Sequence, residues 1–195
     1  MKALKLYIII TIIIIASLSC NGQEKKISLF QKSTTNGGFG GISINVTSHG
    51  KLFVSGEGAA IISNYYFGGF GYGANFGDFH SSNSDIMYEI NQAEGGFLIG
   101  AISNSDHIFA LFSELRFGFG EVVAKSQIDT NIFEIYEDNT FSITPKIGLI
   151  VSPLSYVQLR AFAGYQWFND VDLNGINEGD LNGFRWGFSV YFGYF

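Results

Sequence analysis

The last thirteen residues, Gly183-Phe-Arg-Trp-Gly-Phe-Ser-Val-Tyr-Phe-Gly-Tyr-Phe195, constrain the fold most, because a large apolar side chain occupies every second position. In a β-strand, alternate residues face the same side. A strand so apolar on one face would aggregate in water but suits the hydrocarbon of a membrane. We therefore predict that this segment closes a transmembrane β-barrel. The expected lipid face consists of Phe184, Trp186, Phe188, Val190, Phe192 and Tyr194.

The first 22 residues predict export from the cytoplasm. A short basic start is followed by an apolar run over 6–18, which is typical of a secretory signal peptide and too short to span a membrane as a helix. Cleavage after Gly22 fits ordinary signal peptidase, whereas Ser17-Leu-Ser-Cys20 resembles a lipoprotein box with its leucine one place late. Cys20 is the only cysteine, so an internal disulfide is excluded. We assign 1–22 to the signal peptide, 23–36 to a periplasmic lead-in and 37–195 to the barrel.

The composition agrees with one membrane-embedded domain. Hydrophobic residues make up 47% of the chain and charged residues 14%, a balance that suits a barrel with one face in lipid. No apolar run of about 18 residues follows the signal peptide, so transmembrane helices are not expected. The net charge of -6 argues against a nucleic-acid partner, which requires a basic surface.

Eight segments with strand-like patterns follow one another, and their separators alternate in length. The connections after the second, fourth and sixth segments are short, and those after the third, fifth and seventh are long, as in outer-membrane barrels. We predict an all-β, eight-stranded antiparallel up-and-down barrel, with external loops at 77–85, 125–139 and 169–182. The pattern of the fourth strand also suggests a bulge at Gly95 and Gly96. The predicted strands are 39–47, 52–63, 65–76, 86–102, 108–124, 140–151, 156–168 and 183–195.

The same alternation directs a set of charged residues into the barrel. An eight-stranded barrel is only wide enough for its interior to be filled by side chains. We therefore expect these charges to pair with one another in a filled lumen that conducts no ions. The predicted lumen network consists of Glu57, Glu114, Arg116, Lys146, Arg160 and Arg185.

The last predicted loop resembles a calcium-binding loop. Oxygen ligands at its first, third and fifth positions precede Gly175, and this spacing lets alternate side chains wrap a hard cation. Leu181 stands where a bidentate glutamate is expected. The alternative is a solvated acidic loop, and calcium is the only cofactor that the sequence suggests. The candidate ligands are Asp170, Asp172, Asn174, Glu178 and Asp180.

A second stretch, His80-Ser-Ser82-Asn83 with Glu94 further on, resembles the catalytic motif of outer-membrane lipid A deacylases. The resemblance implies that Ser82 is the nucleophile, His80 the base and Glu94 the residue that orients the histidine. The motif lies in the first half of the chain, whereas the family carries it near the end. An external polar loop without catalytic function explains these residues more simply, and we expect no enzyme.

The runs Gly37-Gly-Phe-Gly-Gly41 and Phe67-Gly-Gly-Phe-Gly-Tyr-Gly73, together with the end of the chain, resemble a family of small uncharacterised exported proteins of Bacteroidota-type bacteria. The resemblance implies an outer-membrane barrel without a known activity. The terminal Phe195 also resembles the aromatic signature that the barrel-assembly machinery reads.

These expectations combine into a monomeric outer-membrane barrel, surrounded by lipid, with a structural or surface-interaction role through its external loops. The first alternative function is a lipid A acyl-ester hydrolase. The second is a soluble exported barrel that binds an apolar ligand, in which the apolar side chains would point inward.

Overall fold

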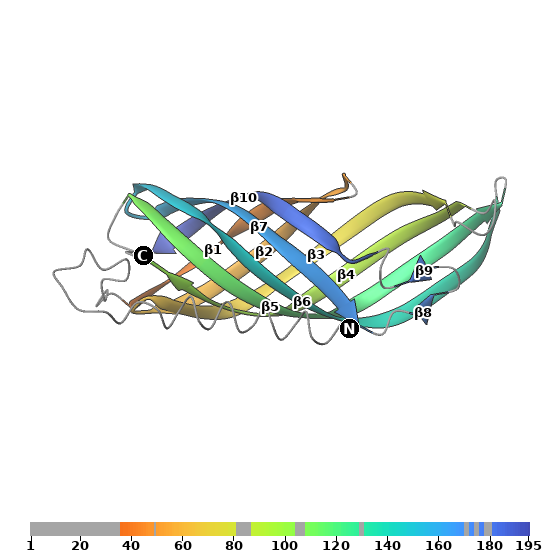
Figure 1. Cartoon of the computed structure of the whole chain (residues 1–195), viewed down its shortest axis with the longest axis horizontal. Coiled ribbons are helices and arrows are strands. Elements are labelled where there is room, and N and C mark those ends of the chain that lie inside the picture. The colour runs from red at the N-terminus through yellow and green to blue at the C-terminus, as the bar shows by residue number, and fades with distance from the viewer. Residues whose placement is uncertain are drawn as a thin grey trace, which may run out of the picture. The chain divides into compact units, whose positions relative to one another are not determined.

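Eight long antiparallel strands close into one barrel, in the order β1-β10-β7-β6-β5-β4-β3-β2 (Figure 1). The computed structural model describes residues 36–48, 50–80, 87–103, 108–128, 131–169, 172–173, 176–177 and 181–195. The predicted all-β, up-and-down barrel is therefore confirmed. The barrel strands are β1 Asn36–Thr47, β2 Leu52–Ile62, β3 Tyr65–His80, β4 Met87–Ile102, β5 Phe109–Ile128, β6 Asn131–Leu154, β7 Val157–Asn169 and β10 Gly183–Tyr194.

Two short strands, β8 Asp172–Leu173 and β9 Ile176–Asn177, pair with each other between β7 and β10. No helix within the described ranges is long and apolar enough to cross a membrane.

The strand that closes the barrel is the one at the end of the chain. β10 pairs with β7 on one side and with β1 on the other, where Ile42 lies opposite Val190. Its residues alternate in exposure: Phe184 and Phe188 are exposed, whereas Arg185 and Ser189 are buried. The alternation seen in the sequence therefore separates an outer apolar face from an inner polar one.

Large apolar side chains cover the outside of the barrel. Phe97, Phe109 and Phe188 are each at least 70% exposed, which is untenable in water and suited to lipid. The alternative of a soluble barrel requires this apolar set to point inward, and the structure shows it outward. Aromatic residues are prominent on the outer face toward both ends. These are Phe119, Phe141, Tyr165, Trp167 and Phe184 toward one end, and Tyr65, Tyr156 and Tyr194 toward the other.

Strands extend into two of the three predicted long loops. β3 continues to His80, and β5 and β6 run to Ile128 and from Asn131, so most of 125–139 is a hairpin. The sequence conceals these extensions because polar residues such as Asp78, Glu134 and Asp138 interrupt the apolar alternation there. The third predicted loop, 169–182, contains β8 and β9, and most of its other residues lie outside the described part of the chain.

The expected bulge at Gly95 and Gly96 is wrong. Both glycines pair in unbroken register with β3 and β5, and the register shift of β3 with β4 lies between Asn75 and Gly77 instead. Small residues at 93, 95 and 96 hide the alternation of β4 in the sequence, which gave the impression of a change of phase.

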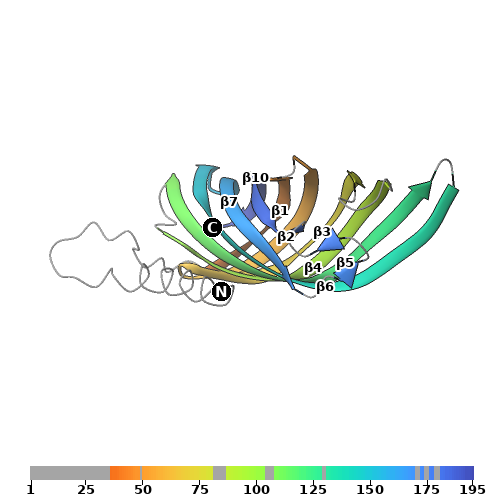
Figure 2. The same ribbon diagram turned by 45° about the vertical axis from the view of Figure 1, so that its right-hand side comes forward.

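Four strands extend beyond the closed barrel as a projecting sheet, which we define as residues 74–80, 87–92, 121–128 and 131–140 of β3 to β6. The pairing of β2 with β3 ends at Gly73, and that of β7 with β6 begins at Phe141. Figures 1 and 2 show the green and teal ends of β5 and β6 reaching well past the other strands. The barrel thus continues on one side as an open four-stranded sheet.

Candidate functional site

The barrel interior contains an ion-pair cluster centred on Arg116 of β5. Its guanidinium donates to the Glu57 carboxylate from β2, and its Nε donates to Glu114 Oε1 at 2.5 Å. Lys146 of β6 lies with its Nζ 3.9 Å from Glu114 Oε1. All four side chains are buried. Because alternate residues of neighbouring strands face the lumen, residues distant in sequence meet there as paired charges.

Uncharged donors complete the hydrogen bonding of the two carboxylates. The hydroxyls of Tyr191 and Ser43 donate to Glu57, and the Tyr66 hydroxyl donates to Glu114 Oε2 at 2.9 Å. A buried carboxylate is tolerated when its oxygens are paired and hydrogen-bonded. The cluster therefore ties strands β1, β2, β3, β5, β6 and β10 together through side chains.

Arg160 of β7 occupies a different environment, a cage of four aromatic rings. Its guanidinium carbon lies 4.4 Å from the ring centroids of Phe39 and Tyr191, and 5.2 Å from those of Tyr66 and Phe112. Only 1% of the residue is exposed. Within the described part of the chain its only hydrogen-bond acceptor is Gln158 Oε1, at 3.0 Å from Nη2. Cation–π contacts, which strengthen when water is excluded, hold this charge in place of a carboxylate.

A third group of polar residues surrounds Glu94 of β4. Tyr72 and Gln166 donate to Glu94 Oε2 at 2.9 and 3.0 Å, and Ser142 donates to Oε1 at 2.8 Å. Arg185 is linked to Glu94 indirectly, because its Nη1 donates to the Tyr72 hydroxyl at 3.2 Å and that hydroxyl donates to Glu94. The Arg185 guanidinium also lies over Phe53, 4.6 Å from the ring centroid. No basic nitrogen of the described residues lies within 4.0 Å of the Glu94 carboxylate.

The six residues predicted for the lumen network are all buried, but the structure brings only four of them together as ion pairs. Arg160 and Arg185 lie against aromatic rings instead. Glu94 is an interior residue that the predicted lumen network lacks, because the expected change of phase at Gly95 leaves its direction unassigned. Extending the alternation of Phe97 and Ile99 back through Gly95 would have directed Glu94 inward.

The predicted catalytic residues are not assembled by the described part of the structure. Ser82 lies outside the described residues, and His80 ends β3 opposite Met87. Met87 is seven positions from Glu94 along β4, or roughly 23 Å at the rise of an extended strand. The structure therefore does not bring His80 and Glu94 together.

Most of the predicted calcium loop also lies outside the described residues, including Asp170, Asn174, Glu178 and Asp180. Asp172 belongs to β8 and pairs with Asn177 of β9. Elsewhere in the described ranges, no group of three or more histidine, cysteine, aspartate or glutamate residues is placed to hold a metal ion.

Comparison with known proteins identifies the fold. No protein-family model matches the chain. No curated protein is detectably similar in sequence. Three solved structures share the architecture, each with a TM-score of 0.50. The first is Ail, the attachment invasion locus protein of Yersinia pestis, in complex with the heparin analogue sucrose octasulfate. It is 11% identical, over 82% of this chain and 97% of Ail.

The second structure is the N-terminal β-barrel domain of OprF from Pseudomonas aeruginosa, 7% identical over 84% of this chain and 100% of that domain. The third is Neisserial surface protein A, 10% identical over 83% of this chain and 98% of that protein. At these identities the likeness concerns the fold alone. Together with the apolar outer surface, this fold identifies the chain as a small eight-stranded β-barrel of the cell outer membrane.

Proposed function

We propose that the protein is a closed, non-conducting barrel that acts at the cell surface through its projecting sheet. The observation that carries this proposal is the pair of strand edges left open where β2 and β7 stop. Residues 74–80 of β3 pair only with β4, and residues 131–140 of β6 pair only with β5, within the described part of the chain. β8 lies near β6 without joining its sheet.

An open edge offers unpaired backbone N–H and C=O groups to another extended chain. Addition of a strand to such an edge is a common mode of peptide recognition, in which backbone hydrogen bonds supply affinity and side chains supply specificity. The barrel then serves as a rigid base that holds the sheet above the membrane. In this proposal the projecting sheet has the surface role, whereas the sequence predicted that role for external loops.

Charge favours a basic partner. Ail binds a polyanionic heparin analogue, whereas the projecting sheet of this chain is rich in carboxylates. Complementary charge accelerates encounter and suppresses partners of like charge. We therefore propose an extended peptide segment carrying lysine or arginine as the ligand class. The acidic residues of the projecting sheet are Asp78, Glu89, Glu121, Glu134, Glu137 and Asp138, against the single lysine Lys125.

Two truncated hairpins test the surface role. Replacing residues 75–91 and residues 122–138 each by Asn-Gly, which favours a two-residue hairpin turn, should remove most of both open edges and leave the barrel intact, because Ala74 stays opposite Gln92 and Glu121 stays opposite Asn139. In neutral nanodiscs, the wild-type protein should bind an immobilised peptide of alternating lysine and valine, and the shortened variant should lose most of this binding.

Two matched peptides separate strand addition from simple charge attraction. A peptide with proline at alternate valines keeps the charge but cannot form the ladder, so it should bind weakly. A glutamate–valine peptide should not bind. Equal binding of the proline peptide, or unchanged binding by the shortened variant, would contradict the proposal.

Conductance tests the closed lumen. The buried ion pairs and the caged Arg160 occupy the interior, and an eight-stranded barrel leaves little further room. Purified protein in a planar lipid bilayer should therefore give no steady ion current at moderate voltage. A reproducible single-channel current that scales with the number of inserted barrels would show that the lumen is open.

A further inference from the structure

The two open edges of the projecting sheet differ in regularity. On β3, the register with β4 shifts between Asn75 and Gly77, so a bulge interrupts that edge. On β6, residues 134–140 pair with β5 in unbroken register. A bulge twists an edge away from a further strand, whereas a regular edge presents evenly spaced backbone groups. The edge of β6 is therefore the more favourable site for strand addition.

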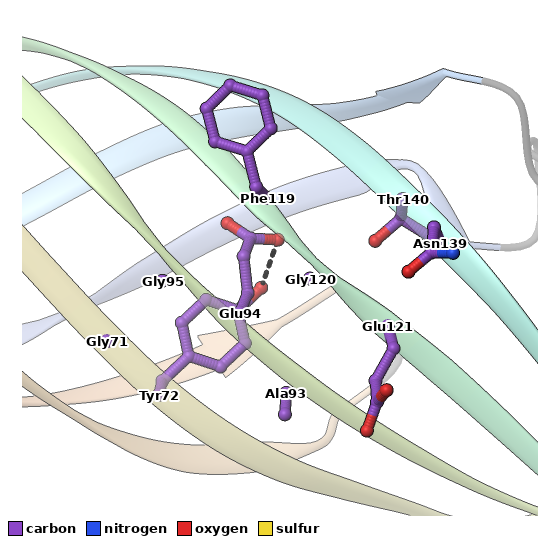
Figure 3. Close-up of a pocket in the computed structure, with 10 residues that line it drawn as sticks. All are labelled: Gly71, Tyr72, Ala93, Glu94, Gly95, Phe119, Gly120, Glu121, Asn139 and Thr140. Carbon is purple, nitrogen blue, oxygen red and sulfur yellow. Dashed lines mark hydrogen bonds between the residues drawn. The ribbon is translucent and has the colours of Figure 1, made fainter.

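The end of β7 sets the direction of a strand added to this edge. β7 runs antiparallel to β6 and ends with Asn169 opposite Phe141. Asn139 and Thr140, labelled in Figure 3, are the last residues of β6 before this pairing begins. Antiparallel pairing is slightly more stable than parallel pairing. A partner strand that continues the line of β7 thus begins opposite Thr140 and proceeds toward Glu137.

Side chains along the edge alternate between the two faces of the sheet, and an added strand follows the same alternation. Glu137 and Asn139 are exposed on the outer face. Asp138 and Thr140 belong to the inner face, where Asp138 is half-buried and Thr140 is only 5% exposed. The partner strand therefore meets one carboxylate on each face of the sheet, at two successive positions.

The edge also has features that favour particular partner side chains. Val123 of β5 lies opposite Glu137, so the strand on that side provides no basic residue for this exposed carboxylate. The buried Thr140 Oγ1 has no hydrogen-bond partner within the described residues. An unpaired buried hydroxyl costs free energy, which a hydroxyl at the paired position of an adjacent strand recovers.

We propose that the edge of β6 recognises an extended segment of the pattern Ser/Thr-x-basic-basic, where x is any residue and basic is lysine or arginine. The hydroxyl lies opposite Thr140, and the two basic residues lie opposite Asp138 and Glu137, one on each face of the sheet. Opposite charges at directly paired positions attract one another across the strands. This inference rests on the strand addition proposed above and specifies its ligand.

Two peptides of identical composition test the pattern on the full protein in neutral nanodiscs. The first has the core Val-Thr-Val-Lys-Lys-Val. The second has the core Val-Thr-Val-Lys-Val-Lys, which turns both lysines to the face of Asp138 and leaves Glu137 opposite valine. The wild-type protein should bind the first peptide roughly twofold to fivefold more tightly, the gain from one further cross-strand charge pair.

Two variants assign this preference to named side chains. Glu137→Gln should make the two affinities equal, because it removes the carboxylate that only the first peptide pairs. Thr140→Val should weaken binding of the first peptide but not of its analogue with valine in place of threonine. Heat-modifiable migration of each variant shows that its barrel has folded.

Asp78→Asn is the matched control, because it removes a carboxylate from the open edge of β3 instead. It should leave the preference for the first peptide unchanged. Equal binding of the two peptides by the wild type, or loss of the preference in Asp78→Asn, would overturn the pattern but leave strand addition standing. If the wild type binds neither peptide, strand addition itself is wrong, and the pattern fails with it.

Discussion

Replacing Glu114 by alanine should lower the free energy of unfolding of the barrel by roughly 3–5 kcal/mol, the usual result of removing one member of a buried ion pair. Glu114 accepts hydrogen bonds from Arg116 and Tyr66, and it is the only carboxylate within 4.0 Å of the Lys146 ammonium in the described part of the chain. The variant would leave Lys146 buried without a counter-ion. A urea titration in lipid vesicles, followed by heat-modifiable migration, measures the change.

The control for this prediction is Glu137→Ala, which removes an exposed carboxylate from the projecting sheet and should change stability by no more than about 0.5 kcal/mol. If the Glu114→Ala barrel unfolds at the same urea concentration as the wild type, the ion-pair cluster does not stabilise the fold.

Arg160→Ala should destabilise the barrel by a similar amount, roughly 3–5 kcal/mol, for a different reason. The substitution empties the space between four aromatic rings and removes their cation–π contacts, but it leaves no carboxylate unpaired. Arg160→Lys keeps a positive charge in the cage and should recover part of the loss. The same urea titration gives both values.

The double variant Glu114→Ala, Arg160→Ala distinguishes coupled from independent contributions. Tyr66 touches both residues: its hydroxyl donates to Glu114 and its ring lies beside the Arg160 guanidinium. The two losses should therefore deviate from simple addition by at least about 0.5 kcal/mol. Strict additivity would show that Tyr66 does not link the cluster to the cage, and an unchanged Arg160→Ala barrel would show that the cage contributes nothing.

Most of the fold prediction rests on the alternation of apolar and polar side chains along each strand. In β10 it separated lipid-facing Phe188 from interior Arg185 without ambiguity, because a strand has only two faces. The prediction failed where that contrast is lost. The ends of β3, β5 and β6 have polar residues at both alternate sets of positions. The small residues around Gly95 carry too little apolar bulk to mark either face.

The sequence by itself therefore determined that the chain is an eight-stranded barrel with an apolar exterior. It also determined that the side chains of six charged residues turn inward. Only the tertiary structure decided their partners: Arg116 meets Glu57 and Glu114, whereas Arg160 meets four rings and Glu94 meets hydroxyls and amides. The reason is that the face on which a side chain lies is set by its own strand, whereas its contact partner is set by the register and closure of all eight strands. This closure places Glu57 and Arg116 together although they are 59 positions apart in sequence.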